Sequence, residues 1–148
     1  MERILVGVDG SAPSLRAVQF AADLASKYNA ELILLTIVPR LSPEVPPEVE
    51  RYARVEHIRV PEAQLAFTAA ENVLGDARRE AVAKGATRVS AGPSFGDPSG
   101  EIIAAARDRG ADLIVVGSRG HGRLVGLLIG SVAQKVVSLA YCPVVVVR

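Results

Sequence analysis

The sequence predicts an α/β domain in which helices cover both faces of a parallel β-sheet. Short apolar runs recur along the chain, and segments with helical periodicity separate them. The runs are nearly continuous in branched aliphatic residues, as in strands that are buried on both faces. Strands that alternate with helices favour right-handed βαβ crossovers. With 148 residues, we expect one domain over residues 1–148.

The elements follow in order along the chain. The apolar runs predict strands at residues 3–8, 31–38, 87–92, 112–117 and 143–148. Apolar residues at helical spacing predict helices at about 13–28, 62–84, 98–109 and 131–140. Gly85 and Gly110 follow two of these helices, at the position where a glycine commonly ends one.

One long connection interrupts this alternation. Residues 39–61 hold five of the nine prolines and many charges. One interpretation is a variable excursion over the surface. The other is a flap near a ligand, because the segment leaves the C-terminal end of the second strand, which is the ligand side of open α/β sheets.

Composition excludes several classes of protein. The net charge of +1 argues against a dedicated nucleic-acid binder, which usually carries a basic face. The single cysteine, Cys142, allows no internal disulfide, as is typical of a reducing cytoplasm. No apolar run approaches the ~20 residues that cross a bilayer. We therefore expect a cytoplasmic protein without a membrane partner.

Glycines gather where the fourth predicted strand meets the fourth predicted helix. Five of the 13 glycines lie in residues 117–130. A helix N-terminus presents unpaired N–H groups and about half a positive charge, and it binds phosphate where glycine lets the backbone come close. The segment lacks the Gly-Lys-Ser/Thr of a P-loop. After Gly120 and Gly122 the next glycine comes one residue too late for the dinucleotide fingerprint.

The spacing Gly117-x2-Gly120-x9-Gly130-Ser131 resembles the nucleotide-binding signature of the universal stress protein family. The start, ILVGVDGSAPSLRAVQFAADLA, and the end, CPVVVVR, are similar to the first and last elements of that family. The resemblance implies a three-layer open sandwich with a five-stranded parallel sheet of order 3-2-1-4-5, Rossmann-like and of the adenine nucleotide alpha hydrolase type. A ligand crevice is then expected between the first and fourth strands, where the strand order reverses.

The resemblance also implies an ATP site. By carry-over, Gly117, Arg119, Gly120 and His121 line the ribose and phosphates, and Gly130, Ser131 and Val132 bind the phosphates. Asp9 faces the adenosine or a phosphate-bound metal, Val38 meets adenine through its main chain, and Val8, Gly10 and Ser11 form the adjoining wall. Because the loop has few cationic side chains, we expect Mg²⁺ or Mn²⁺ on the phosphates, without a metal cage made by the protein.

Simpler interpretations remain open for several of these residues. Ser131 and Gln134 have the spacing of a capping box, in which Ser131 would only begin a helix. Asp9 precedes Gly10 and is the residue type that shapes such a turn. Arg119 and His121 are also typical of solvated loops.

Three classes of function fit this sequence. The first is an ATP-binding, nucleotide-gated regulatory or stress-response homodimer that acts on a downstream protein. The second is a slow ATP hydrolase or nucleotidyl-transfer enzyme, which would need a base or nucleophile that no motif supplies. The third is a stress protein that acts through protein contacts without ATP. The complete glycine signature favours the first class, with no catalytic residue and at most weak ATP hydrolysis, partly by fold analogy.

A second copy of the chain is the expected partner. In the strand order 3-2-1-4-5 the last strand lies at an edge of the sheet. Its four valines, Val144–Val147, would leave an open apolar edge that invites pairing. The family resemblance suggests a two-fold dimer built on this strand.

Overall fold

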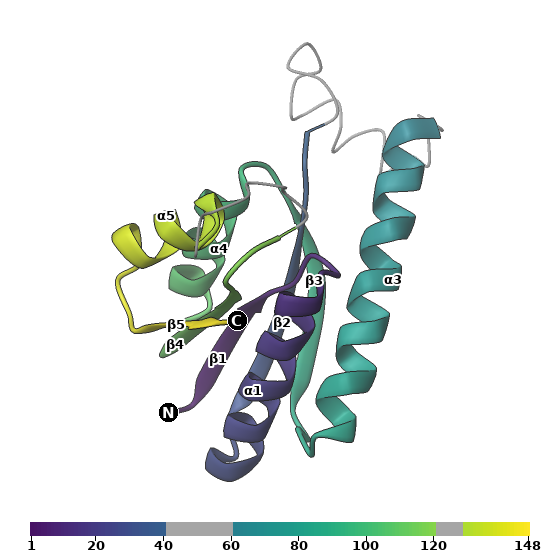
Figure 1. Ribbon diagram of the computed structural model, residues 1–148. Helices are drawn as coiled ribbons and strands as arrows, with labels where there is room; N and C mark the ends of the chain where they lie inside the picture. Colours follow the sequence, from purple (N-terminus) through teal and green to yellow (C-terminus); the bar gives the residue numbers. More distant parts are fainter. Residues whose placement is uncertain (41–60, 121–128) are drawn as a thin grey trace.

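The computed structural model describes residues 1–40, 61–120 and 129–148, and strands alternate with helices throughout that part (Figure 1). The second interpretation of the long connection, a flap over a ligand, therefore concerns residues that lie almost entirely outside the described ones. The elements are β1 (Arg3–Gly7), α1 (Ala12–Tyr28), β2 (Glu31–Val38), α3 (Pro61–Ala83), β3 (Val89–Phe95), α4 (Pro98–Asp108), β4 (Leu113–Gly117), α5 (Ser131–Leu139) and β5 (Val144–Val147).

The strands form one parallel sheet in the order β3-β2-β1-β4-β5, which confirms the predicted fold. Gly7 at the end of β1 pairs with Leu35 of β2 on one side and with Val116 of β4 on the other. The strand order reverses between β1 and β4. The C-terminal ends of β1 and β4 therefore lie side by side, and a ligand crevice is expected just beyond them.

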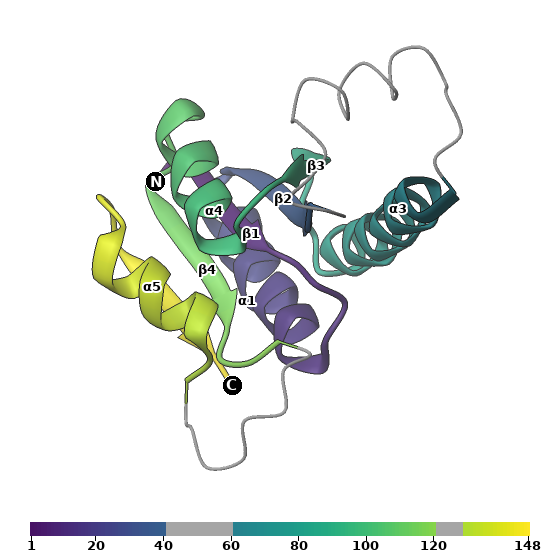
Figure 2. The ribbon, with the colours of Figure 1, turned by 90° about the horizontal axis from the view of Figure 1, so that it is seen from above.

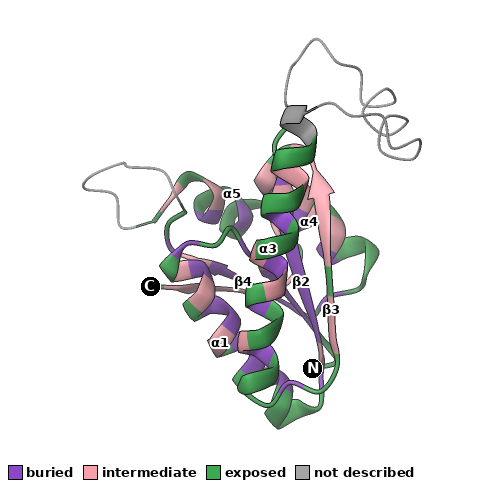
Figure 3. Cartoon of the chain, turned by 90° about the vertical axis from the view of Figure 1, so that its right-hand side faces the viewer, coloured by how far each residue is buried: buried purple, intermediate pink, exposed green. Residues whose placement is uncertain are grey.

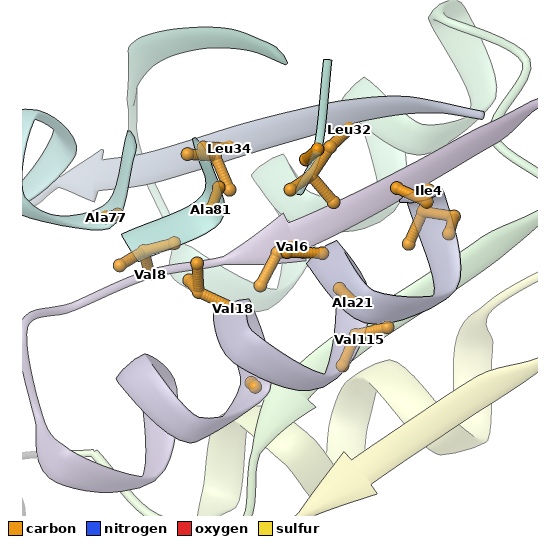
Figure 4. Packing of buried hydrophobic residues seen from close by; sticks show 14 of the residues in the cluster. Ile4, Val6, Val8, Val18, Ala21, Leu32, Leu34, Ala77, Ala81 and Val115 are labelled. Atoms are coloured by element: carbon orange, nitrogen blue, oxygen red, sulfur yellow. The ribbon is translucent and has the colours of Figure 1, made fainter. Parts of the chain in front are cut away.

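Two helices cover each face of the sheet. Seen from above, α1 and α3 lie on one side of the strands and α4 and α5 on the other (Figure 2). On the first face, Val6 and Leu34 pack with Val18 of α1 (Figure 4). On the second, Leu5 and Ile33 belong to the core cluster that includes residues of α4 and α5. Because alternate residues of each central strand enter different clusters, the strands are apolar throughout, as the sequence pattern indicated.

β3 differs from its predicted bounds. The sequence predicted a strand at 87–92, whereas β3 runs to Phe95 and contains Pro93. The β2–β3 hydrogen bonds use Arg88, whose carbonyl accepts from Leu32, and Gly96, whose N–H donates to Val38. The main-chain groups of the even-numbered residues of β3 therefore face β2. Those of Pro93 face the open edge of the sheet, where the missing N–H costs no hydrogen bond of the sheet.

The helices show two kinds of N-terminus. Ser11 caps α1 by accepting the Ser14 N–H at 3.3 Å, and Asp97 caps α4 by accepting the Gly100 N–H at 2.9 Å. The N-cap of α5 is Gly130, which has no side chain to do the same. In the part of the chain that is described, no helix is both long enough and apolar enough to cross a membrane.

Candidate functional site

A cavity of about 550 Å³ opens at the C-terminal ends of β1, β2 and β4. This volume lies within the range of small-molecule sites. The cavity has a polar end and an apolar end. The polar side chains in its lining are Asp9, Ser14, Thr36, Ser118, Arg119 and Ser131.

The polar end contains the N-terminus of α5. Gly130, Ser131 and Val132 all line the cavity, and the Gly130 N–H donates to the carbonyl of Ser118 at 2.6 Å. Ser131 is the first residue inside the helix rather than its cap, so the capping-box interpretation of Ser131 with Gln134 is wrong. The first N–H groups of α5 thus have no side-chain cap and border the cavity, as an anion-binding helix end requires.

Asp9 faces this helix end across the β1–β4 junction. Its Oδ1 accepts the Ser11 N–H at 2.9 Å, and Gly10 has a φ of +80°, so Asp9 does shape the turn after β1. Its Oδ2 lies against Gly120 in the loop after β4. Because Asp9 also lines the cavity, shaping the turn and facing a ligand are compatible roles.

The signature glycines also allow the protein itself to pack. A β-carbon at Gly117 would lie 2.8 Å from the main chain of Pro13 and Ser14, in the first turn of α1. At Gly130 it would lie 3.3 Å from the Ser118 carbonyl oxygen. The absence of side chains at these positions therefore brings α1, the loop after β4 and α5 together around the cavity.

The family model described as the universal stress protein family matches residues 1–148. The chain belongs to the universal stress protein family. A universal stress protein of Bacillus subtilis, YxiE, is 33% identical over 152 residues, which cover 99% of this chain and 98% of the relative.

Solved structures of the family share the fold. The universal stress protein UspA of Lactobacillus plantarum superimposes with a TM-score of 0.81 at 24% identity, over 99% of this chain and 97% of that one. A universal stress protein solved in complex with cAMP has a TM-score of 0.74 at 29% identity, with the same coverage of both chains. At least one family member of similar sequence therefore holds an adenine nucleotide.

The apolar end of the cavity in this universal stress protein was not predicted from the sequence. Ala66, Ala69, Ala70 and Val73 line it from α3, at the spacing of one helix face. Figure 3 shows α3 alongside β3 with much of its surface exposed, whereas Leu74, Ala77 and Ala81 in its later turns belong to a core cluster. The helical spacing of these residues was visible in the sequence, but nothing local indicated that they border a cavity.

The predicted wall residues divide into two groups. Val8 lines the cavity, whereas Gly10 and Ser11 do not belong to its lining. Ser11 is buried, and its hydroxyl lies 3.4 Å from the carbonyl of Arg119, to which it donates. Ser11 thus ties the start of α1 to the loop after β4 from behind the cavity. His121 lies outside the described residues.

Ile37 is better placed than Val38 to offer main-chain groups to a ligand. Main-chain groups of successive strand residues point to opposite neighbours. The Val38 carbonyl accepts the Gly96 N–H at 3.2 Å on the β3 side. The Leu35 carbonyl accepts the Val8 N–H at 2.8 Å on the β1 side. The main-chain N–H and C=O of Ile37 therefore point to the β1 side, beyond the last β1–β2 pair. Ile37 also lines the cavity.

The described residues contain no group of three or more His, Cys, Asp or Glu side chains that could hold a metal ion. Within the described lining of the cavity, Asp9 is the one carboxylate and Arg119 the one cationic side chain. The site therefore offers an anion the N–H groups of a helix N-terminus and one cationic side chain, Arg119.

Proposed function

We propose that this universal stress protein binds ATP in the cavity and acts as a nucleotide-gated regulator. The observation that carries the proposal is the uncapped N-terminus of α5, which borders one end of a cavity whose other end is apolar. An adenine nucleotide has the same polarity, with phosphates at one end and an aromatic base at the other. The relative solved with cAMP supports an adenine nucleotide as the ligand.

The polarity of the cavity orients the nucleotide. The phosphates lie beside Gly117, Gly120 and the start of α5, whose first N–H groups stabilise negative charge. The base lies between the end of β2 and the alanine face of α3. In this orientation Ile37, rather than Val38, offers its main chain to adenine, and Asp9 lies nearer the ribose and phosphates.

A divalent ion, Mg²⁺ or Mn²⁺, enters with the phosphates in this proposal. The backbone N–H groups of α5 fit a phosphate chain, and the ion neutralises the charge that they leave. Asp9 is the described carboxylate of the lining that could contact it. Beside Asp9, the described lining contains no histidine, lysine or cysteine that could serve as a general base, which favours a regulator over a hydrolase.

The second part of the proposal is a homodimer through β5. The carbonyls of Pro143 and Val147 accept the N–H groups of Ile114 in β4 and of Ser118 just after it, so the main-chain groups of Val144 and Val146 face outward. At the opposite edge of the sheet, Pro93 occupies an outward-facing position of β3 and blocks pairing there. Antiparallel pairing of two β5 strands about Val145 would satisfy both outward residues.

The test of the nucleotide site begins with protein purified without added nucleotide. The protein is denatured, and any released small molecule is identified by chromatography and mass spectrometry. ATP with Mg²⁺, and separately cAMP, are then titrated into stripped wild type and Gly130→Val by calorimetry. Gly92→Val is the matched control, because a β-carbon at Gly92 meets nothing within 4 Å and Gly92 lies outside the cavity lining.

The proposal expects wild type and Gly92→Val to bind ATP, Gly130→Val to bind much more weakly, and no ADP to accumulate over hours. Steady conversion of ATP to ADP would identify an enzyme instead. Binding of cAMP in strong preference to ATP would replace the triphosphate in the proposal. Absence of binding by wild type would leave a protein that acts through protein contacts alone.

A further inference from the structure

Thr36 is a polar residue buried in β2 beside the proposed base position. The residue is 6% exposed, and its hydroxyl donates to the carbonyl of Val8 at 2.8 Å. Thr36 also belongs to the lining of the cavity. Val8 is the residue at which β1 stops pairing with β2, so this hydrogen bond lies where the crevice opens.

The Val8 carbonyl is the acceptor that the sheet would otherwise use next. The Val8 N–H donates to the Leu35 carbonyl at 2.8 Å, which is the last main-chain bond between β1 and β2. In a parallel pair the following bond would join the Ile37 N–H to the Val8 carbonyl. Among the described residues that bond is absent, and the Thr36 hydroxyl occupies the Val8 carbonyl instead.

The direction of the Thr36 side chain explains why its hydroxyl, rather than the Ile37 N–H, donates to the Val8 carbonyl. Leu32, Leu34 and Val8 belong to the core cluster under α1 and α3, and Thr36 follows Leu34 by two residues on the same face of β2. A hydroxyl on that face reaches the Val8 carbonyl when the carbonyl tilts out of the plane of the sheet. Such a tilt would take the carbonyl off the line of the Ile37 N–H, in keeping with the missing bond.

We propose that Thr36 is a positioning residue, which holds the Val8 carbonyl so that the main chain of Ile37 stays available to the base of a bound nucleotide. This inference rests on the proposed function. Adenine presents a ring nitrogen that accepts a hydrogen bond beside an amino group that donates one. The N–H and C=O of one strand residue complement that pair, but only where no neighbouring strand has taken them.

Valine at position 36 keeps the shape of threonine and removes the donor. The buried Val8 carbonyl then lacks its partner, and because an unpaired buried carbonyl is costly, it turns back to the Ile37 N–H. β1 and β2 would pair one step further along the chain. The main-chain groups that the base needs would then be used by the protein itself.

Amide hydrogen exchange, measured by NMR on the full chain, tests the proposal together with calorimetry. In nucleotide-free wild type the Ile37 amide should exchange quickly, and ATP with Mg²⁺ should slow it at least about tenfold. In nucleotide-free Thr36→Val the same amide should already be slowed by at least about tenfold. ATP affinity should fall about tenfold in Thr36→Val and recover in Thr36→Ser, which restores the hydroxyl.

The outcomes separate this inference from the function on which it rests. If wild type binds no adenine nucleotide, the proposed function fails. If wild type binds ATP but the Ile37 amide is equally fast with and without it, the function stands and the role of Thr36 is overturned. Equal ATP affinity of Thr36→Val and wild type overturns that role as well. Should Thr36→Val fail to fold, the wild-type exchange of Ile37 and the affinity of Thr36→Ser decide.

Discussion

The carboxylate of Asp9 rests against the backbone of Gly120, so that a β-carbon at Gly120 would lie 2.5 Å from Asp9 Oδ2. This contact joins the turn after β1 to the loop after β4, the two sides of the point where the strand order reverses. The other oxygen of Asp9 accepts the Ser11 N–H at 2.9 Å. Asp9 therefore cannot turn away from Gly120 without releasing the turn that leads into α1.

Gly120→Ala should weaken nucleotide binding more than it weakens the fold. The new methyl group displaces Asp9 Oδ2, and loss of the hydrogen bond to Ser11 costs about 1 kcal/mol of folding free energy. We expect ATP affinity to fall about tenfold by calorimetry. Gly92→Ala is the control, because its β-carbon meets nothing within 4 Å. Wild-type affinity in Gly120→Ala would show that the position of Asp9 does not matter to the ligand.

Gly117→Ala should destabilise the protein even without nucleotide. Its β-carbon would lie 2.8 Å from the main chain of Pro13 and Ser14, and main-chain atoms cannot swing aside as a side chain can. Overpacking of this kind costs about 1–3 kcal/mol, which urea unfolding of stripped protein measures. If Gly117→Ala keeps its stability but loses ATP binding, packing against Pro13 and Ser14 does not require the glycine. Close approach of a phosphate would then explain it.

Repeating local patterns made most of the fold predictable. The continuous apolar runs marked β1, β2 and β4 because strands covered on both faces need apolar residues at every position. β3 was the least accurate strand, since a proline usually argues against a strand. The sequence could not show that Pro93 faces an open edge, where its missing N–H removes no bond.

The site was less predictable, because its residues meet through packing of distant segments. Ser131 matches a local capping rule, yet the chain geometry makes Gly130 the cap. The alanine face of α3 and the hydroxyl of Thr36 gain their meaning only from what lies opposite them. The choice between Ile37 and Val38 depends on the register of three strands, which no local pattern reports.

Ala69→Leu tests the apolar end of the cavity. Ala69 lines the cavity and is exposed, so a larger side chain fills the proposed base position rather than the protein core. We expect ATP affinity to fall at least about tenfold, since a base cannot share the volume. The melting temperature should stay or rise, because Leu74, Ala77 and Ala81 hold the later turns of α3 in the core.

Thr68→Leu is the matched control for that variant. Thr68 precedes Ala69 on the same helix, is exposed, and lies outside the cavity lining. It adds similar apolar bulk to α3 without entering the proposed base position. Equal ATP affinity in Ala69→Leu and Thr68→Leu would place the base elsewhere.

The carboxylate of Asp112 lies at the N-terminal ends of the strands, away from the cavity. It predicts that the free energy of unfolding depends on pH. Its carboxylate accepts the N–H groups of Glu2 at 2.6 Å and Arg3 at 2.9 Å, and these bonds, Glu2 first, lower the pKa of Asp112. A carboxyl whose folded pKa lies below its unfolded value, about 3.9, stabilises the fold above that value. The contribution is lost as the pH falls through the folded pKa.

Asp112→Asn should therefore be less stable than wild type at pH 7 and equally stable once both are studied well below pH 3.9. The free energy of unfolding, from urea titrations at several pH values, measures the difference. The group is exposed, so we expect no more than about 1 kcal/mol at pH 7. A difference that persists unchanged in acid would mean that shape, rather than charge, explains the effect.

Val146→Pro tests the proposed dimer without breaking the sheet within one chain. The main chain of Val146 faces away from β4, so proline there removes a donor that only a second copy could use. Pro93 already occupies an equivalent outward position in β3. Val145 is a poorer choice: the side chains of both valines pack against a core cluster, but the main chain of Val145 faces β4.

Analytical ultracentrifugation should find wild type as a dimer and Val146→Pro as a monomer with its helical and sheet content retained by circular dichroism. Val145→Pro is the contrasting variant, because it removes an N–H from the β4–β5 ladder and should lower the stability of the monomer itself. A dimer that survives Val146→Pro would move the interface away from β5. A wild type that sediments as a monomer would remove the dimer from the proposal and leave each nucleotide site to act alone.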